Sequence, residues 1–105
     1  NPKDPNARIQ AYERNFESKY KKASDAFAAT AYDAIYILKQ AMEKRGYSAD
    51  DIKDALYQIR NFPGVTGSTT FDKNGDVIKP VGIKMIKDGK FIFLNDNLQP
   101  ISPTP

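Results

Sequence analysis

The stretch that divides this chain is Phe62-Pro-Gly-Val-Thr-Gly-Ser-Thr-Thr-Phe-Asp-Lys-Asn-Gly-Asp-Val-Ile-Lys-Pro80. Before it, apolar residues recur at helical spacing, and after it they alternate as they do in strands. Pro63-Gly64 ends the preceding helix, because proline has no amide donor and disfavours helical geometry in the residue before it. Asn74-Gly75 predicts a tight two-residue hairpin turn, since both central residues of that turn need positive φ. The sequence therefore predicts helices first and β-hairpins afterwards.

Part of this stretch also resembles the start of a calcium-binding EF-hand loop, with Asp72, Asn74 and Asp76 as the first ligands. Such a loop needs glycine at its sixth position and a bidentate glutamate at its twelfth. Those positions hold Val77 and Ile83 here. Without the glutamate the coordination shell is incomplete, so a turn is expected and a metal site is not.

The composition is that of one domain or part of one, with 105 residues of which 40% are hydrophobic. Charged residues make up 28%, the formal net charge is +3, and the lysines are spread along the chain, which argues against a nucleic-acid partner. The chain has no cysteine and no histidine, which excludes disulfides, thiolate nucleophiles, the usual zinc sites and histidine general bases. Neither an enzyme nor a cofactor is expected.

The chain carries no recognisable targeting segment. No apolar run approaches the length needed to span a membrane, and no signal peptide is present. The chain begins on Asn1 without an initiator methionine, which indicates a mature product or an excised piece of something longer.

A first helix is expected from Pro5 to about Lys22, with Asp4 as its N-cap. Its apolar residues recur at three- and four-residue steps and predict a buried face, although an aromatic stripe of this kind could also stack on bases. The members of the stripe are Ile9, Tyr12, Phe16 and Tyr20.

A second helix is expected over Ala26–Arg45, with Ser24 or Asp25 as its cap and Gly46 as its stop. Several of its sides are apolar, which is typical of a central helix packed between two layers. One apolar stripe consists of Phe27, Ala31, Ile35, Leu38 and Met42, and much of the remaining circumference is apolar too, at Ala28, Tyr32, Tyr36 and Ile37.

Ser48 caps a third predicted helix, whose acidic first turn is best explained as a solvated helix start. Its predicted buried face consists of Ile52, Ala55, Leu56 and Ile59. Further on, Asp88-Gly89 predicts a second tight turn, with a returning strand over Lys90–Leu94. The remaining residues, 95–105, are polar and proline-rich and are expected to fray.

Five segments occur in a distinctive order: Asp25-Ala-Phe-Ala-Ala-Thr-Ala-Tyr-Asp-Ala34, Glu43-Lys-Arg-Gly46, Ile52-Lys-Asp-Ala-Leu56, Phe62 to Asp76, and Lys87-Asp-Gly-Lys-Phe91. In this order and spacing they resemble the C-terminal part of type I periplasmic solute-binding proteins. The subfamily they resemble most is the Leu/Ile/Val-binding receptors of ATP-driven amino-acid importers. The resemblance covers nearly the whole chain.

The resemblance implies an α/β fold of two doubly wound lobes joined by three crossovers, with ligand bound in the cleft between them. This chain, 1–105, would be a C-terminal segment of that fold, with residues 1–79 in the first lobe. Residues 80–94 would form the crossover and a second-lobe hairpin, and 95–105 a tail. Three helices followed by two hairpins would look like an α+β protein in isolation. Pro80 suits a crossover, because it stiffens the chain and donates no ladder hydrogen bond.

The resemblance also implies a ligand-binding position at the start of the second helix. Phe27 matches an aromatic residue that commonly faces the cleft in this family and packs on the ligand side chain. Asp25 and Ser24 lie beside it at a helix N-terminus, where a polar ligand group could be met. The alternative is that Phe27 is a core residue. The groups that hold the carboxylate and ammonium of an amino acid lie mostly in N-terminal segments of the family that this chain does not contain.

By resemblance, the expected function is non-catalytic binding of a branched-chain or related amino acid by the periplasmic component of an ABC transporter. The expected partners are the ligand, a membrane permease and the remaining segment of the receptor. An isolated fragment would expose apolar helix faces and self-associate. Two alternatives stay open: a ligand-sensing domain of a receptor or regulator with the same fold, and a self-standing α+β interaction module.

Overall fold

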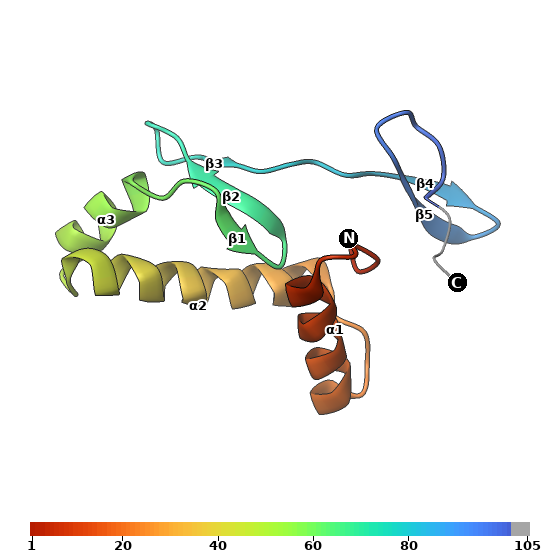
Figure 1. Cartoon of the computed structure of the whole chain (residues 1–105), viewed down its shortest axis with the longest axis horizontal. Coiled ribbons are helices and arrows are strands. Elements are labelled where there is room, and N and C mark those ends of the chain that lie inside the picture. Colours follow the sequence, from red (N-terminus) through yellow and green to blue (C-terminus); the bar gives the residue numbers. More distant parts are fainter. Residues whose placement is uncertain (102–105) are drawn as a thin grey trace.

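The computed structural model describes residues 1–101, in which three helices precede five short strands (Figure 1). This order confirms the expected α/β class, with helices before hairpins. The elements are α1 (Ala7–Tyr20), α2 (Ala26–Arg45), α3 (Ala49–Tyr57), β1 (Phe62–Gly64), β2 (Gly67–Phe71), β3 (Val77–Ile78), β4 (Ile83–Lys87) and β5 (Lys90–Leu94).

The start of α1 differs from the prediction. Its N-cap is Asn6, whose side-chain oxygen accepts a hydrogen bond from the amide of Arg8 at 2.9 Å. The carboxylate of Asp4, the predicted cap, instead accepts from the amide of Asn6 at 2.9 Å and forms the turn that precedes the helix. The prediction was wrong because two nearby side chains compete for the role of cap, and both favour turns.

Both later helices begin as expected, and α2 also ends as expected, whereas Ile59 of the face predicted for the third helix lies beyond the end of α3. The carboxylate of Asp25 caps α2 by accepting from the amide of Ala28 at 2.8 Å, and Gly46 follows the helix with a φ of 128°. The hydroxyl of Ser48 caps α3 by accepting from the amide of Asp51 at 3.1 Å. These interactions satisfy helix-end amides from side chains only three residues away, so sequence alone predicts them.

An antiparallel sheet with strand order β1-β2-β3 lies over α2, with α3 beside it (Figure 1). Phe62 pairs with Thr69, which is 1% exposed at the middle of β2. Pro63-Gly64 was expected only to end a helix, but it belongs to β1. Proline is tolerated there because β1 lies at the edge of the sheet and needs to donate no ladder hydrogen bond on its outer side.

The connection between β2 and β3 is longer than predicted. It is a five-residue loop, 72–76, and not a two-residue turn. One carboxylate oxygen of Asp72 accepts from the amides of Asn74 at 2.8 Å and Asp76 at 2.9 Å, and this closes the loop. Only Gly75 adopts a positive φ, of 85°. The predicted turn type was wrong because the aspartate side chain replaces backbone bonds that a two-residue turn would make.

The β4–β5 hairpin forms a separate two-stranded sheet, with Ile83 paired to Leu94. Its turn is the tight two-residue turn that the sequence predicts. Asp88 and Gly89 both have positive φ, at 52° and 72°. This is the backbone geometry that matches the twist of the flanking strands.

The chain beyond β5, residues 95–105, was expected to fray. Within its described part, the side-chain oxygen of Asn95 accepts from the amide of Gln99 at 2.9 Å. The amide of Ile101 then donates to the carbonyl of Phe93 at 2.9 Å. The expectation was therefore wrong as far as Ile101, because this segment turns back along β5, and the rest of the tail lies outside the described residues.

The buried side chains form two clusters. One connects α1 to the turn between β1 and β2, with Ala29 of α2 packed against it, and the other connects α2, α3 and β1. Burial of this apolar surface holds the helices to the small sheet. The first cluster consists of Ile9, Tyr12 and Val65, and the second of Ile37, Ile59 and Phe62.

Helix α2 was predicted to be packed between two layers, but within residues 1–101 only one of its sides is buried, so the prediction was wrong for the side that carries Phe27 and Ile35. Its buried residues are Asp33, Ile37 and Ala41, which face α3 and the three-stranded sheet. In the predicted stripe, Phe27 is 87% exposed and Ile35 is 66% exposed. The helix has apolar residues on both sides, so periodicity could not decide which side meets a partner among the described residues.

The molecule is elongated, with principal extents of 50 × 33 × 21 Å. Its radius of gyration is 16.1 Å, whereas a compact domain of this size has about 13 Å. The cause is visible in Figure 1: an extended segment after β3 carries the β4–β5 hairpin away from the helices. Within residues 1–101, each helix is too short or too polar to cross a bilayer.

Candidate functional site

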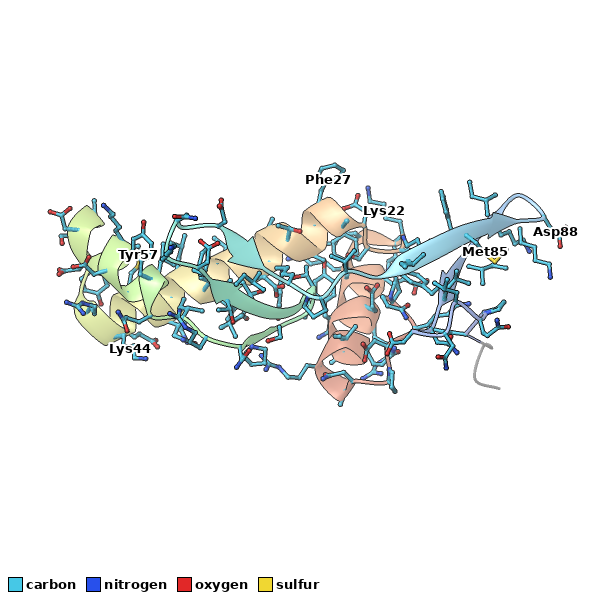
Figure 2. All side chains as sticks on the ribbon, turned by 90° about the horizontal axis from the view of Figure 1, so that it is seen from above. Lys22, Phe27, Lys44, Tyr57, Met85 and Asp88 are labelled. Atoms are coloured by element: carbon cyan, nitrogen blue, oxygen red, sulfur yellow. The ribbon has the colours of Figure 1, made fainter. Side chains whose placement is uncertain are left out.

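Phe27, the predicted ligand contact, lies in the first turn of α2. Its side chain is 87% exposed and belongs to neither core cluster. Figure 2 shows it projecting outward from the N-terminal end of the helix. An isolated phenylalanine in this position contributes nothing to the packing of the chain, so it is available for contact with another group.

The two polar residues beside Phe27 already have structural partners. One carboxylate oxygen of Asp25 accepts the amide of Ala28, which stabilises the start of α2. The hydroxyl of Ser24 lies 2.7 Å from that of Tyr12, a residue that is only 7% exposed. Ser24, Asp25 and Phe27 lie on one short segment, and the contact between Ser24 and Tyr12 holds this segment to α1.

A row of aromatic rings connects α1 to α2. Neighbouring ring centroids are 4.7 to 5.9 Å apart, and each pair is tilted. A hydrogen bond with Tyr36, together with burial, raises the pKa of Tyr32. The predicted buried face of α1 is thus confirmed at Ile9 and Tyr12, although Tyr20 at its end is 54% exposed. In order, the rings are those of Tyr36, Tyr32, Tyr12, Phe16 and Tyr20.

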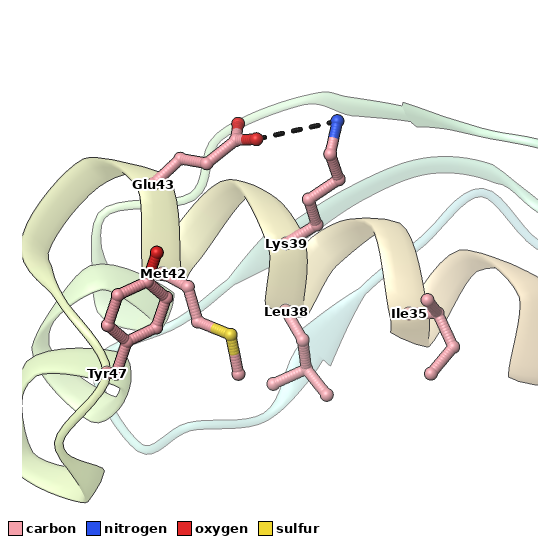
Figure 3. A pocket seen from close by; sticks show the side chains of 6 residues that line it. All are labelled: Ile35, Leu38, Lys39, Met42, Glu43 and Tyr47. Carbon is pink, nitrogen blue, oxygen red and sulfur yellow. Dashed lines mark ion pairs between the residues drawn. The ribbon is translucent and has the colours of Figure 1, made fainter.

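Among the hollows that residues 1–101 form on the surface, two are described below, and Phe27 lines neither of them. The larger, of about 430 Å³, is an apolar groove on the C-terminal half of α2 (Figure 3). Lys39 and Glu43 lie at its edge and form an ion pair of 3.5 Å. The smaller, of about 120 Å³, lies between α1, α2 and β1 and includes Arg8 and Asp33. The larger groove is lined by Ile35, Leu38, Lys39, Met42, Glu43 and Tyr47.

Asp33 was not identified as a functional candidate from the sequence, yet it is a charged residue enclosed in the core. It is 3% exposed, and its carboxylate accepts hydrogen bonds from the amide of Val65 and from the amide and hydroxyl of Thr66. The sequence did contain one signal that could have pointed to Asp33, namely an aspartate in the middle of a helix that is otherwise largely apolar. The partners lie more than 30 positions away, so their identity could not be read from spacing.

The described residues offer no metal-binding group of three or more acidic side chains. In the loop that resembles a calcium site, an oxygen of Asp72 accepts two backbone amides of its own loop. Every buried polar side-chain atom within residues 1–101 has a hydrogen-bond partner. The candidate site is therefore a surface for apolar contact, with Phe27 exposed on α2 and further apolar side chains exposed along the same helix.

The helices leave an apolar side of α2 uncovered, and an extended segment joins them to the separate β4–β5 hairpin. A family model described as periplasmic binding protein matches residues 1–90. Since the match includes most of the chain, this chain belongs to the periplasmic binding protein family, a family of solute-binding proteins. The resemblance seen in the sequence is confirmed, and the alternative of a self-standing interaction module is not favoured.

Three crystal structures are similar to this chain. The leucine-binding protein LivK of Thermotoga maritima is 31% identical with a TM-score of 0.78, over 90% of this chain and 28% of that protein. An ABC transporter substrate-binding protein of Desulfitobacterium hafniense, solved with leucine, is 32% identical with a TM-score of 0.78, over 90% and 29%. LivJ of Streptococcus pneumoniae, a branched-chain amino acid transporter substrate-binding protein solved with isoleucine, is 30% identical with a TM-score of 0.74, over 84% and 25%. The chain thus spans less than a third of the length of these proteins.

Proposed function

We propose that this chain is the C-terminal segment of the extracytoplasmic solute-binding component of an ABC importer, and that it is not an enzyme. The receptor would bind a branched-chain or related amino acid between two lobes. The observation that carries the proposal is Phe27, an exposed aromatic ring at the N-terminus of α2, in a chain similar to proteins solved with leucine or isoleucine. An aromatic ring suits a branched aliphatic side chain, because the contact is apolar and needs no hydrogen bond.

The proposal divides the chain into two parts. Residues 1–79, with α1 to β3, would belong to the first lobe, and residues 80–94 would form the crossover and a hairpin of the second lobe. The elongated shape supports this division, since the β4–β5 hairpin stands apart at the end of an extended segment. Ligand contacts with both lobes would favour the closed state by a hinge motion.

The proposal gives each residue of the site a role. Phe27 would cover the ligand side chain, while Asp25 and Ser24 would meet a polar ligand group at the helix N-terminus. Asp25 has one carboxylate oxygen committed to its cap, so its other oxygen is the one that remains for a ligand. The groups that hold the ligand carboxylate and ammonium would come from the part of the receptor outside this chain.

The partners follow from the same proposal. The exposed apolar side of α2, with Ile35, Leu38 and Met42, would be covered by the remaining segment of the receptor. In the absence of that segment, the same side would drive self-association of the fragment, because a contiguous apolar patch favours burial. The complete receptor would deliver its ligand to a membrane permease.

The test is calorimetric titration of the full-length receptor with leucine and isoleucine. Phe27→Ala should weaken binding by roughly 10- to 100-fold, because one buried aliphatic contact contributes about 1.5–3 kcal/mol. Phe91→Ala is the matched control, since Phe91 is also exposed, at 72%, but lies on β5. Asp25→Ser keeps a competent cap and removes the carboxylate, so it separates a role in ligand contact from a role in helix capping. Equal affinity in the Phe27 and Phe91 variants would overturn the site.

A further inference from the structure

Asp33 is a buried carboxylate in the middle of α2 that the proposed ligand site does not use. Its Oδ1 accepts from the amide of Val65 at 2.8 Å, and its Oδ2 accepts from the amide and the hydroxyl of Thr66 at 2.9 and 2.6 Å. Burial of a carboxylate is strongly unfavourable unless donors replace water. The three donors meet that need, and they hold the turn between β1 and β2 at one place on α2.

The same turn is connected to the segment that leaves the helical body. The ammonium of Lys79 donates to the hydroxyl oxygen of Thr66. A hydroxyl can donate to Asp33 and accept from Lys79 at the same time, so the three side chains form one continuous path. The ring of Pro80 lies against the turn as well, since a Cβ built at Gly67 would be 3.9 Å from its Cδ. The chain is thus held to α2 up to this point.

We infer that Asp33, Thr66 and Lys79 are positioning residues that fix, relative to α2, the point where the link to the second lobe begins. Because α2 also carries Phe27, the path determines where the β4–β5 hairpin stands relative to the proposed ligand. What this inference says about ligand binding rests on the proposed function.

Two pairs of variants in the full-length receptor separate an effect of breaking the hydrogen-bonded path from an effect on general stability. Lys79→Met removes the ammonium and keeps most of the side-chain length, and Lys73→Met is its control in the exposed 72–76 loop. Thr66→Val removes the hydroxyl at nearly constant volume, and Thr66→Ser restores it. Asp33 is left unchanged, because its loss would leave buried amides without an acceptor and would unfold the turn.

The first measurement is double electron–electron resonance between spin labels at Lys22→Cys and Lys90→Cys, two exposed positions before α2 and on the β4–β5 hairpin. Without ligand, Lys79→Met and Thr66→Val should broaden the distance distribution, whereas Lys73→Met and Thr66→Ser should match the unmodified receptor. The second measurement is the Kd for leucine, which should rise roughly fivefold in the two disrupting variants, since closure must then order a loosened link. If the two disrupting variants lower the melting temperature but leave the distance distribution and the Kd unchanged, the residues have a purely structural role and the inference is overturned.

The two proposals fail in different ways. If the unmodified receptor binds neither leucine nor isoleucine, the proposed function fails, and the distance distributions in the absence of ligand still decide whether the path holds the link. If the unmodified receptor binds ligand and Lys79→Met is indistinguishable from Lys73→Met in both measurements, the path has no positioning role and the proposed function stands.

Discussion

Tyr12 and Ser24 are joined by a hydrogen bond of 2.7 Å between their hydroxyl oxygens, and this contact holds α1 to the residue that precedes the cap of α2. Tyr12 is 7% exposed, and its ring also lies 4.8 Å from that of Tyr32. The side chain therefore connects the core of the helical body with the segment that presents Phe27. The position of the proposed ligand contact depends on α1, the element that precedes α2 in the chain.

Removal of this hydroxyl gives a first prediction. Tyr12→Phe keeps the ring and should lower the free energy of unfolding by about 1 kcal/mol, the usual net contribution of one hydrogen bond. Tyr20→Phe, at a ring that is 54% exposed, should change it by less than about 0.5 kcal/mol. Urea unfolding of the chain followed by circular dichroism measures both. A Tyr12→Phe midpoint equal to that of Tyr20→Phe would show that the hydrogen bond adds no stability.

Gly64 is constrained by the buried carboxylate. A Cβ at this position would overlap Oδ2 of Asp33, which cannot move without loss of its hydrogen bonds. Gly64→Ala should therefore lower stability by about 1–3 kcal/mol through overpacking. Gly82→Ala is the control, because its Cβ would meet no atom within 4 Å. Thermal unfolding of the two variants should separate them clearly, and equal melting temperatures would contradict the close approach of Asp33 to Gly64.

The exposed side of α2 gives a prediction whose sign depends on the rest of the receptor. In the isolated chain, Ile35→Ser should reduce self-association, because Ile35 is 66% exposed within the apolar groove. In the full-length receptor, the same change should lower stability by about 1.5–3 kcal/mol, since the side chain would there be buried. Sedimentation velocity and thermal unfolding measure the two effects. An unchanged melting temperature of the full-length variant would mean that this side of α2 stays uncovered.

The second core cluster predicts a large effect at Ile59, which is 3% exposed and packs with Ile37 and Phe62. Ile59→Ala should cost about 2–5 kcal/mol, the sum of lost burial and the cavity that remains. Ile78→Ala makes the same change at a side chain that is 58% exposed, and its cost should stay below about 1 kcal/mol. The comparison uses denaturant midpoints, and similar midpoints would place Ile59 outside the core.

Much of the architecture follows from local sequence. The order of helices and hairpins, the ends of α2, the cap of α3 and the turn at Asp88-Gly89 were all predicted correctly. Where local signals competed, prediction failed: Asn6 caps α1 in place of Asp4, and Asp72 closes a longer loop than Asn74-Gly75 indicates. In both cases a neighbouring polar side chain offered an alternative acceptor for backbone amides.

The sequence by itself determined the elements, because caps, glycine stops and tight turns depend on groups within about four residues of each other. It also placed Ser24, Asp25 and Phe27 together, since they are near neighbours along the chain. Only the tertiary structure decided which side of α2 is buried and what Asp33 does. The role of Asp33 depends on the turn at Val65 and Thr66, which lies more than 30 positions away. The burial of α2 depends on which of its apolar sides packs against another element. The periodicity of one helix contains neither fact.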